Sequence, residues 1–289
     1  MILERVVLSS DFGPKFLNFL PIVSHFWNAK FGILPDVGLV VRRDHWNLAT
    51  TVAERFSSLA SFHLLQSHSE VPIANQAKLA RLFLAAQLTS SWTTVDDMDT
   101  AHFREDYLRE RFLRGEPGKL LAIGHDVYQG TAHDGNFPMG NLSGDSQTFL
   151  DLFASFLEAG ESFMNFLERL KTLPFHSAHA NPWNSPSQFS DEYLVRSVRI
   201  HNGFDDRIIL ESRQLNILKQ WLDRSWWPNL LRITWNRKVY SSANFPRPFL
   251  ENRARILSAL RIIDPTLPIP PLLLPYRTEE WDRLISKQL

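Results

Sequence analysis

Residues 5–41 read RVVLSSDFGPKFLNFLPIVSHFWNAKFGILPDVGLVV, and their pattern changes twice. The first six residues are mainly apolar with β-branched side chains, and they stop at a Ser-Asp-Phe-Gly-Pro loop of the kind that starts helices. Residues 16–27 then repeat apolar side chains at intervals of three and four. Gly32 and Pro35 break this period before an apolar run at residues 37–41. The stretch predicts a strand, a helix and a second strand.

A second round of alternation follows. Residues 50–59 are predicted to be helical, residues 62–66 extended, and residues 75–88 a strongly amphipathic helix. An extended segment that carries aspartates comes directly after that helix. Alternation of this kind favours a mainly parallel sheet covered by helices. We therefore expect the α/β class, with a Rossmann-like, mixed but mainly parallel central sheet flanked by helices.

The rest of the chain is less regular. Residues 129–144 are rich in Gly, Asn and Asp and predict a long loop, a feature that is often functional in compact domains. We expect one catalytic domain over residues 1–250, with a C-terminal helix and a Pro-rich tail over residues 251–289 packing on it. Further helices are predicted at 104–113, 146–170, 190–198 and 215–221, and a turn with Gly and Pro residues is predicted before residues 120–128.

Composition excludes several classes of protein. The chain has 289 residues, with 31 basic side chains balanced by 31 acidic ones, so no overall field attracts nucleic acid or an anionic membrane. It has no cysteine, which excludes disulfides, thiolate metal sites and a cysteine nucleophile. No apolar run approaches the length of a transmembrane helix. We expect a cytoplasmic protein without a transmembrane segment and without a nucleic-acid partner.

Three polar clusters fall where predicted strands end. They are Ser9-Ser10-Asp11, Gln66-Ser67-His68 and Asp96-Asp97-Met98-Asp99. Ligands of open α/β sheets bind at the carboxyl ends of the strands, so these clusters are expected to converge. On a strand, Asp97 and Asp99 would point the same way, and a carboxylate pair suits a hard divalent cation that also binds diphosphate. The alternative is that these aspartates only end a strand and cap the next helix.

The order of these pieces resembles the GT-A fold glycosyltransferases, which transfer sugar from a nucleoside-diphosphate donor. The resemblance spans roughly residues 5–250. The similar stretches are Val6-Val7-Leu8-Ser9-Ser10, residues 16–27, Pro72 to Arg81, Val95-Asp-Asp-Met-Asp99, Phe137-Pro-Met139 and Asp191-Glu192-Tyr-Leu194.

The resemblance implies a metal-dependent glycosyltransferase that moves a sugar to a carbohydrate hydroxyl. Its cofactor would be Mn or Mg, and its partners a nucleotide sugar and a glycan or glycoconjugate acceptor. Where such enzymes often have a metal-binding His before an Arg-Pro pair, this chain has Asn244. The implied metal ligands are therefore Asp97, Asp99 and Asn244. The implied donor-binding residues are Ser9, Ser10, Gln76, Arg81 and Asp96.

The acceptor hydroxyl would lose its proton to Asp191 or Glu192, and we prefer Asp191. An acidic residue at the start of a helix is also a routine cap, so both residues have an ordinary structural explanation. Sequence does not show whether the anomeric configuration inverts, and a base is required only if it does.

Two other functions stay open. Asp97-Met-Asp99-Thr100 superficially resembles the D-x-D of haloacid-dehalogenase-like phosphatases, although that motif usually lies on the first strand. A non-catalytic module that binds nucleotides or carbohydrates is the third possibility. The chain has no G-x-S-x-G elbow, no P-loop, no G-x-G-x-x-G and no H-E-x-x-H, which disfavours acyl hydrolases, P-loop kinases, dinucleotide oxidoreductases and zinc hydrolases.

Overall fold

The computed structural model describes residues 1–140, 142–175, 181–183, 190–212, 221, 222, 224, 227, 233 and 240–266. Most of the helix expected at 215–221 lies outside these ranges, as does the chain beyond residue 266. Within the described ranges, no helix combines the length and the hydropathy that crossing a membrane requires.

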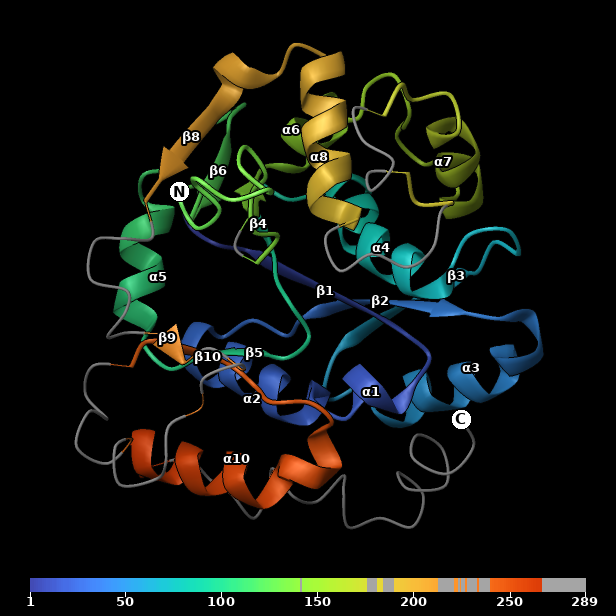
Figure 1. Ribbon diagram of the computed structural model, residues 1–289. Coiled ribbons are helices and arrows are strands. Elements are labelled where there is room, and N and C mark those ends of the chain that lie inside the picture. Colours follow the sequence, from blue (N-terminus) through green and yellow to red (C-terminus); the bar gives the residue numbers. More distant parts are fainter. Residues whose placement is uncertain are drawn as a thin grey trace.

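The central sheet has seven strands and is mainly parallel, as the alternation of elements predicts (Figure 1). The first four strands in its order run parallel to one another. The fifth, β7, is antiparallel to both of its neighbours, and the last two run parallel to each other. The order is β3 (Ser61–Gln66), β2 (Asp36–Val41), β1 (Arg5–Asp11), β4 (Thr93–Val95), β7 (Leu142–Gly144), β6 (Leu120–Ile123) and β8 (Ile208–Glu211).

Both faces of this sheet are covered by helices, which explains why its strands are apolar on both sides. In β1, Val6 and Leu8 pack into one hydrophobic cluster, while Val7 packs into the other. The helices α1 (Pro14–Leu17), α2 (Leu20–Phe31) and α3 (Trp46–Arg55) contribute to the first cluster. The second is formed with α4 (Ile73–Gln87), α6 (Ser146–Leu152), α7 (Phe163–Leu170) and α8 (Ser190–His201).

Close packing of α4 on the sheet depends on Gly38 in β2. A Cβ atom at Gly38 would lie 2.8 Å from Leu84 Cδ1, too close for two carbon atoms. The helix can therefore approach the strand only because this position has no side chain. This contact holds the carboxyl-terminal half of α4 against the sheet.

Two predicted helices are each divided in the structure. The helix expected at 16–27 is α1 followed by α2, and Pro21 lies in the first turn of α2, where its missing N–H costs no hydrogen bond. The helix expected at 146–170 is α6 followed by α7. Between them Gly160 adopts a positive φ of 77°, and the side chain of Ser162 caps α7 by accepting from Asn165 N at 3.2 Å.

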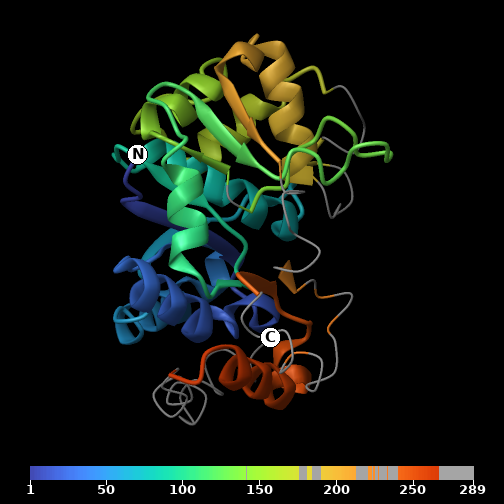
Figure 2. The ribbon, with the colours of Figure 1, turned by 90° about the vertical axis from the view of Figure 1, so that its left-hand side faces the viewer.

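A second, three-stranded sheet lies beside the carboxyl end of β4. Its order is β5 (Thr100–His102), β10 (Ser242–Asn244) and β9 (Trp221–Leu222), with α5 (Glu105–Phe112) following β5. Next comes α10 (Phe249–Ile263), which joins the cluster of α1 and α2, since Phe249 packs on Phe19 with ring centroids 5.1 Å apart. In Figure 2, α8 (orange, top) and α10 (red, bottom) lie at opposite ends of the molecule.

Candidate functional site

The D-x-D aspartates lie in a turn that follows β4. The strand ends at Val95, and Thr100 N donates to Asp97 O at 3.1 Å to close the turn. The expectation that Asp97 and Asp99 lie on one face of a strand is therefore wrong. Because the backbone turns between them, their carboxylates have different partners.

Arg81 links the first of these aspartates to α8. Its Nη1 donates to Asp97 Oδ1 at 2.6 Å and to Asp96 O at 3.0 Å, and its Nη2 donates to Asp191 Oδ2 at 2.5 Å. Burial of the guanidinium opposes its charge, but the two carboxylates outweigh burial and raise the pKa of Arg81. Arg81 thus brings the D-x-D turn and the predicted base together, and it contacts carboxylates where the sequence predicted contact with the donor.

The two acidic residues that open α8 have different environments. Glu192 Oε1 accepts from the Tyr128 hydroxyl at 2.9 Å, and Glu192 Oε2 is buried with no partner among the residues that the structure describes. Burial, and then the charge of Asp191, raise the pKa of Glu192 to about 9. Glu192 is therefore protonated at neutral pH, whereas the carboxylate of Asp191 pairs with the Arg81 guanidinium at 2.5 Å. The role of either residue as a base stays a prediction.

Asp99 is enclosed by two arginines. Its side chain is 2% exposed, and its Oδ2 lies 2.7 Å from both Arg224 Nη1 and Arg247 Nε. Burial raises the pKa of Asp99 to about 7; Arg224 opposes this rise, and the nearby charge of Asp97 adds to it. No spacing rule pointed to Arg224, which is 125 residues from Asp99 along the chain.

A buried network of Asp96, His102 and Ser242 holds the turn in place. Asp96 Oδ1 accepts from Asp97 N, while Asp96 Oδ2 and His102 Nε2 are 2.8 Å apart. His102 Nδ1 in turn lies 2.8 Å from Ser242 Oγ. All three side chains are at most 1% exposed, so this Asp-His-Ser arrangement holds the second sheet to the turn and has no access to a substrate. Asp96, predicted to bind the donor, is used here to hold the turn.

Asn244 lies beside Asp99 as the resemblance implies. Its strand β10 pairs with β5, and the next residue, Phe245, donates its N–H to Asp99 O at 2.8 Å. Trp227 Nε1 donates to Asn244 O at 3.1 Å and fixes the backbone there. The side-chain oxygen Asn244 Oδ1 is buried with no partner in the described part of the chain, so a ligand could satisfy it.

The contacts of Asp97, Asp99 and Asn244 bear on the predicted metal site. Carboxylate and amide oxygens are the ligands that Mg²⁺ and Mn²⁺ prefer. However, Asp97 already contacts one guanidinium and Asp99 two, and among the described residues no three His, Asp or Glu side chains form a metal-binding group. The residues do not fit a divalent cation in this arrangement, and the metal role of Asp97, Asp99 and Asn244 stays a prediction.

Two other predicted donor-binding residues use their side chains within the protein. The Ser10 hydroxyl donates to Asp11 O at 2.7 Å. Gln76 donates to His68 O and Val71 O at 2.8 and 2.7 Å, and it accepts from His68 N at 2.7 Å. Gln76 therefore holds the loop of residues 68–71 in place. Ser9, at the same end of β1, is partly exposed.

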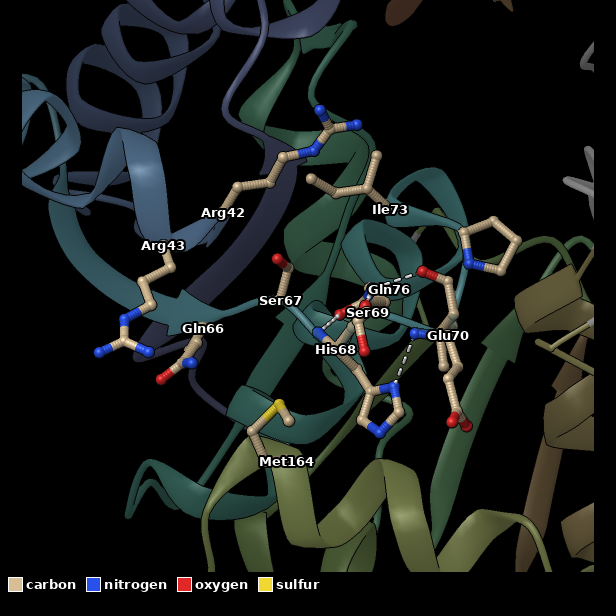
Figure 3. A pocket seen from close by; sticks show the side chains of 12 residues that line it. Arg42, Arg43, Gln66, Ser67, His68, Ser69, Glu70, Ile73, Gln76 and Met164 are labelled. Carbon is tan, nitrogen blue, oxygen red and sulfur yellow. Dashed lines mark hydrogen bonds between the residues drawn. The ribbon is translucent and has the colours of Figure 1, made fainter.

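That loop forms one wall of a cavity of about 700 Å³ at the carboxyl ends of β2 and β3 (Figure 3). In this view Arg43 and Gln66 lie on one side of it, Glu70 lies on the other, and Met164 lies below. Its volume is in the range of small-molecule sites, and its lining combines apolar and polar side chains. Asp11, at the end of β1, pairs in register with Val40 of β2, two residues before Arg42 in the cavity wall, so the cavity lies near the end of β1.

The loop before β7 closes on the same turn. A Cβ atom at Gly140 would lie 3.3 Å from Asp96 Oδ1 and 3.7 Å from Asp97 Oδ2. Phe137, in one of the stretches that carry the resemblance, is buried, and the Arg199 guanidinium lies 4.7 Å from its ring centroid. The long loop therefore borders the carboxylate cluster.

Comparison of the sequence with protein-family models and with curated proteins finds no match. Comparison of the fold finds galactosyltransferase LgtC, solved with donor and acceptor sugar analogs, at 13% identity and a TM-score of 0.52. The aligned region covers 97% of this chain and 100% of the LgtC chain. An active-site mutant of LgtC also matches, with 12% identity and a TM-score of 0.47, over 84% of this chain and 88% of the mutant. The bifunctional glycosyltransferase WbbM matches with 13% identity and a TM-score of 0.42, over 92% of this chain and 50% of WbbM. The similarity to LgtC shows that the chain has a GT-A-type fold.

Proposed function

We propose that this protein is a glycosyltransferase that moves a sugar from a nucleoside-diphosphate donor to a hydroxyl of a carbohydrate acceptor. The observation that carries the proposal is the cluster of Arg81, Asp97 and Asp191, which gathers at the carboxyl end of β4. In an α/β sheet of this type that edge is where ligands bind. The similarity to a galactosyltransferase solved with donor and acceptor sugar analogs supports the same conclusion.

The parts of the donor have separate places in this proposal. The cavity beside β2 and β3 would take the nucleoside, because its volume and mixed lining suit a base and a ribose. The diphosphate would extend towards the turn that contains Asp97 and Asp99. The sugar would then lie between this turn and the first turn of α8.

Transfer forms a bond from the acceptor oxygen to the anomeric carbon and breaks the bond to the diphosphate, which leaves with the electron pair. Asp191 is positioned by Arg81 to accept the hydroxyl proton if the configuration inverts. Protonated Glu192, held by Tyr128, would donate a hydrogen bond from its buried oxygen to a sugar hydroxyl. Both roles rest on the placement of these side chains at one edge of the sheet.

The phosphatase alternative gains no support. Its nucleophile would be Asp97, which follows the fourth strand along the chain and accepts a hydrogen bond from Arg81. The D-x-D motif of such phosphatases usually lies on the first strand, whereas Asp97 comes after β4. A non-catalytic binding module remains an outcome of the experiment below.

The experiment measures the melting temperature of the protein with UDP, GDP and dTDP. At a hundred times the Kd, a bound nucleotide stabilises the fold by about 2.7 kcal/mol, so one nucleotide should raise the melting temperature by about 5 °C or more. Asp191→Asn should keep this rise while losing sugar transfer. An unchanged melting temperature with all three nucleotides would refute the proposal, and a rise without any turnover would identify a binding module.

A further inference from the structure

The two arginines on Asp99 come from distant parts of the chain. Arg247 follows β10, and Arg224 lies between β9 and β10. Their side chains remain 27% and 28% exposed, although the carboxylate that they contact is buried. Arg247 is further held by Phe16, whose ring centroid lies 4.6 Å from its guanidinium carbon. Both guanidinium groups are thus fixed at one end and open to solvent at the other.

Their open ends still have hydrogen-bond donors to offer. A guanidinium has five N–H groups, and Asp99 is approached by Nη1 of Arg224 and by Nε of Arg247. For the other nitrogens of these two side chains, the described residues provide no acceptor. Planar guanidinium groups with free N–H pairs match phosphate oxygens, which they bind through two parallel hydrogen bonds.

Arginines pair with the carboxylates around the turn. Among the described residues, Asp97 and Asp191 pair with Arg81, and Asp99 pairs with Arg224 and Arg247. A divalent cation on Asp99 would meet two guanidinium groups on the same carboxylate. Like charges at such short distances repel, and the double charge of the cation strengthens its repulsion from each arginine. The arrangement favours an incoming anion over an incoming cation.

We propose that Arg224 and Arg247 bind the diphosphate of the donor and supply the positive charge that the sequence assigned to a metal ion. This inference rests on the proposed function. Asp99 acts as the positioning residue, because it fixes one edge of each guanidinium and leaves the others for phosphate oxygens. As the bond to the anomeric carbon breaks, the electron pair passes to the diphosphate oxygen, and the two arginines stabilise the negative charge there.

The first test needs no variant. Titration calorimetry measures the Kd of the wild-type protein for UDP, GDP and dTDP, once with EDTA and once with MnCl₂. The nucleotide that binds should have a Kd with EDTA within about threefold of its Kd with Mn²⁺, a difference of less than 1 kcal/mol. Binding that requires Mn²⁺ would overturn this inference and keep the proposed function. Absence of binding in both conditions would overturn both.

The second test assigns the binding to these side chains. Arg224→Gln and Arg247→Gln should each weaken binding of the nucleoside diphosphate at least tenfold in EDTA, and binding of the nucleoside without phosphate less than twofold. Arg104→Gln is the matched control, because the Arg104 side chain is 42% exposed and pairs with Asp106, not with Asp99. Equal loss of nucleoside and diphosphate binding, or no loss of either, would overturn the assignment.

Discussion

Glu192→Gln tests the environment of the acidic helix start through the pH dependence of stability. The pKa of Glu192 is raised from 4.5 to about 9 in the folded protein by burial and then by Asp191. Between these values the folded state binds one more proton than the unfolded state at this position. The free energy of unfolding therefore falls with rising pH by about 1.4 kcal/mol per unit from this group alone. The contribution is complete below pH 4.5 and lost as the pH rises through about 9.

Gln has the shape of the protonated acid but does not titrate, so Glu192→Gln removes only this slope. From pH 6 to pH 8 the wild-type protein should lose about 2.7 kcal/mol more stability than the variant. Urea unfolding of both proteins at the two pH values measures the difference, and all other ionisable groups are common to both. A difference that stays within about 0.5 kcal/mol between pH 6 and pH 8 would refute the buried, protonated state of Glu192.

Three further substitutions test the contacts that build the site. Arg81→Met leaves two carboxylates without their shared guanidinium and should destabilise the protein by about 3–5 kcal/mol in urea unfolding; a loss below about 1 kcal/mol would contradict the bridging role. Gln76→Ala removes three hydrogen bonds, so amide hydrogen exchange should accelerate at residues 68–71, and unchanged protection there would contradict its role in the loop. His102→Leu leaves Asp96 buried without its partner and should lower the melting temperature by about 6 °C or more, whereas an unchanged value would show that the network does not hold the turn.

The alternating elements of the fold could be predicted from sequence because they depend on local periodicity. The strand expected at residues 5–10 is observed at Arg5–Asp11, and the helix expected at 75–88 is observed at Ile73–Gln87. The sequence predicted one helix over residues 146–170 because the apolar period continues on both sides of Gly160. The helix breaks there because Gly160 has a positive φ.

The site was predicted only in part, because its geometry depends on contacts between distant segments. The sequence identified Asp97, Asp99 and Asp191 as candidates, and the structure brings Asp97 and Asp191 to one guanidinium. The sequence could not show that the chain turns after Val95 and separates the two D-x-D carboxylates. Arg81 and Asp191 are 110 residues apart, and Arg224 and Asp99 are 125 apart, so no local pattern encodes either pair.

Release of a nucleoside diphosphate from a panel of UDP-, GDP- and dTDP-sugars tests the proposed glycosyl transfer most directly. With mono- and disaccharide acceptors, the wild-type protein should release the diphosphate from at least one donor and give a product heavier than the acceptor by one sugar residue. Asp191→Asn should bind that donor and give little or no product. No release from any donor, with or without acceptor and with or without Mn²⁺, would contradict the assignment of this protein as a nucleotide-sugar glycosyltransferase.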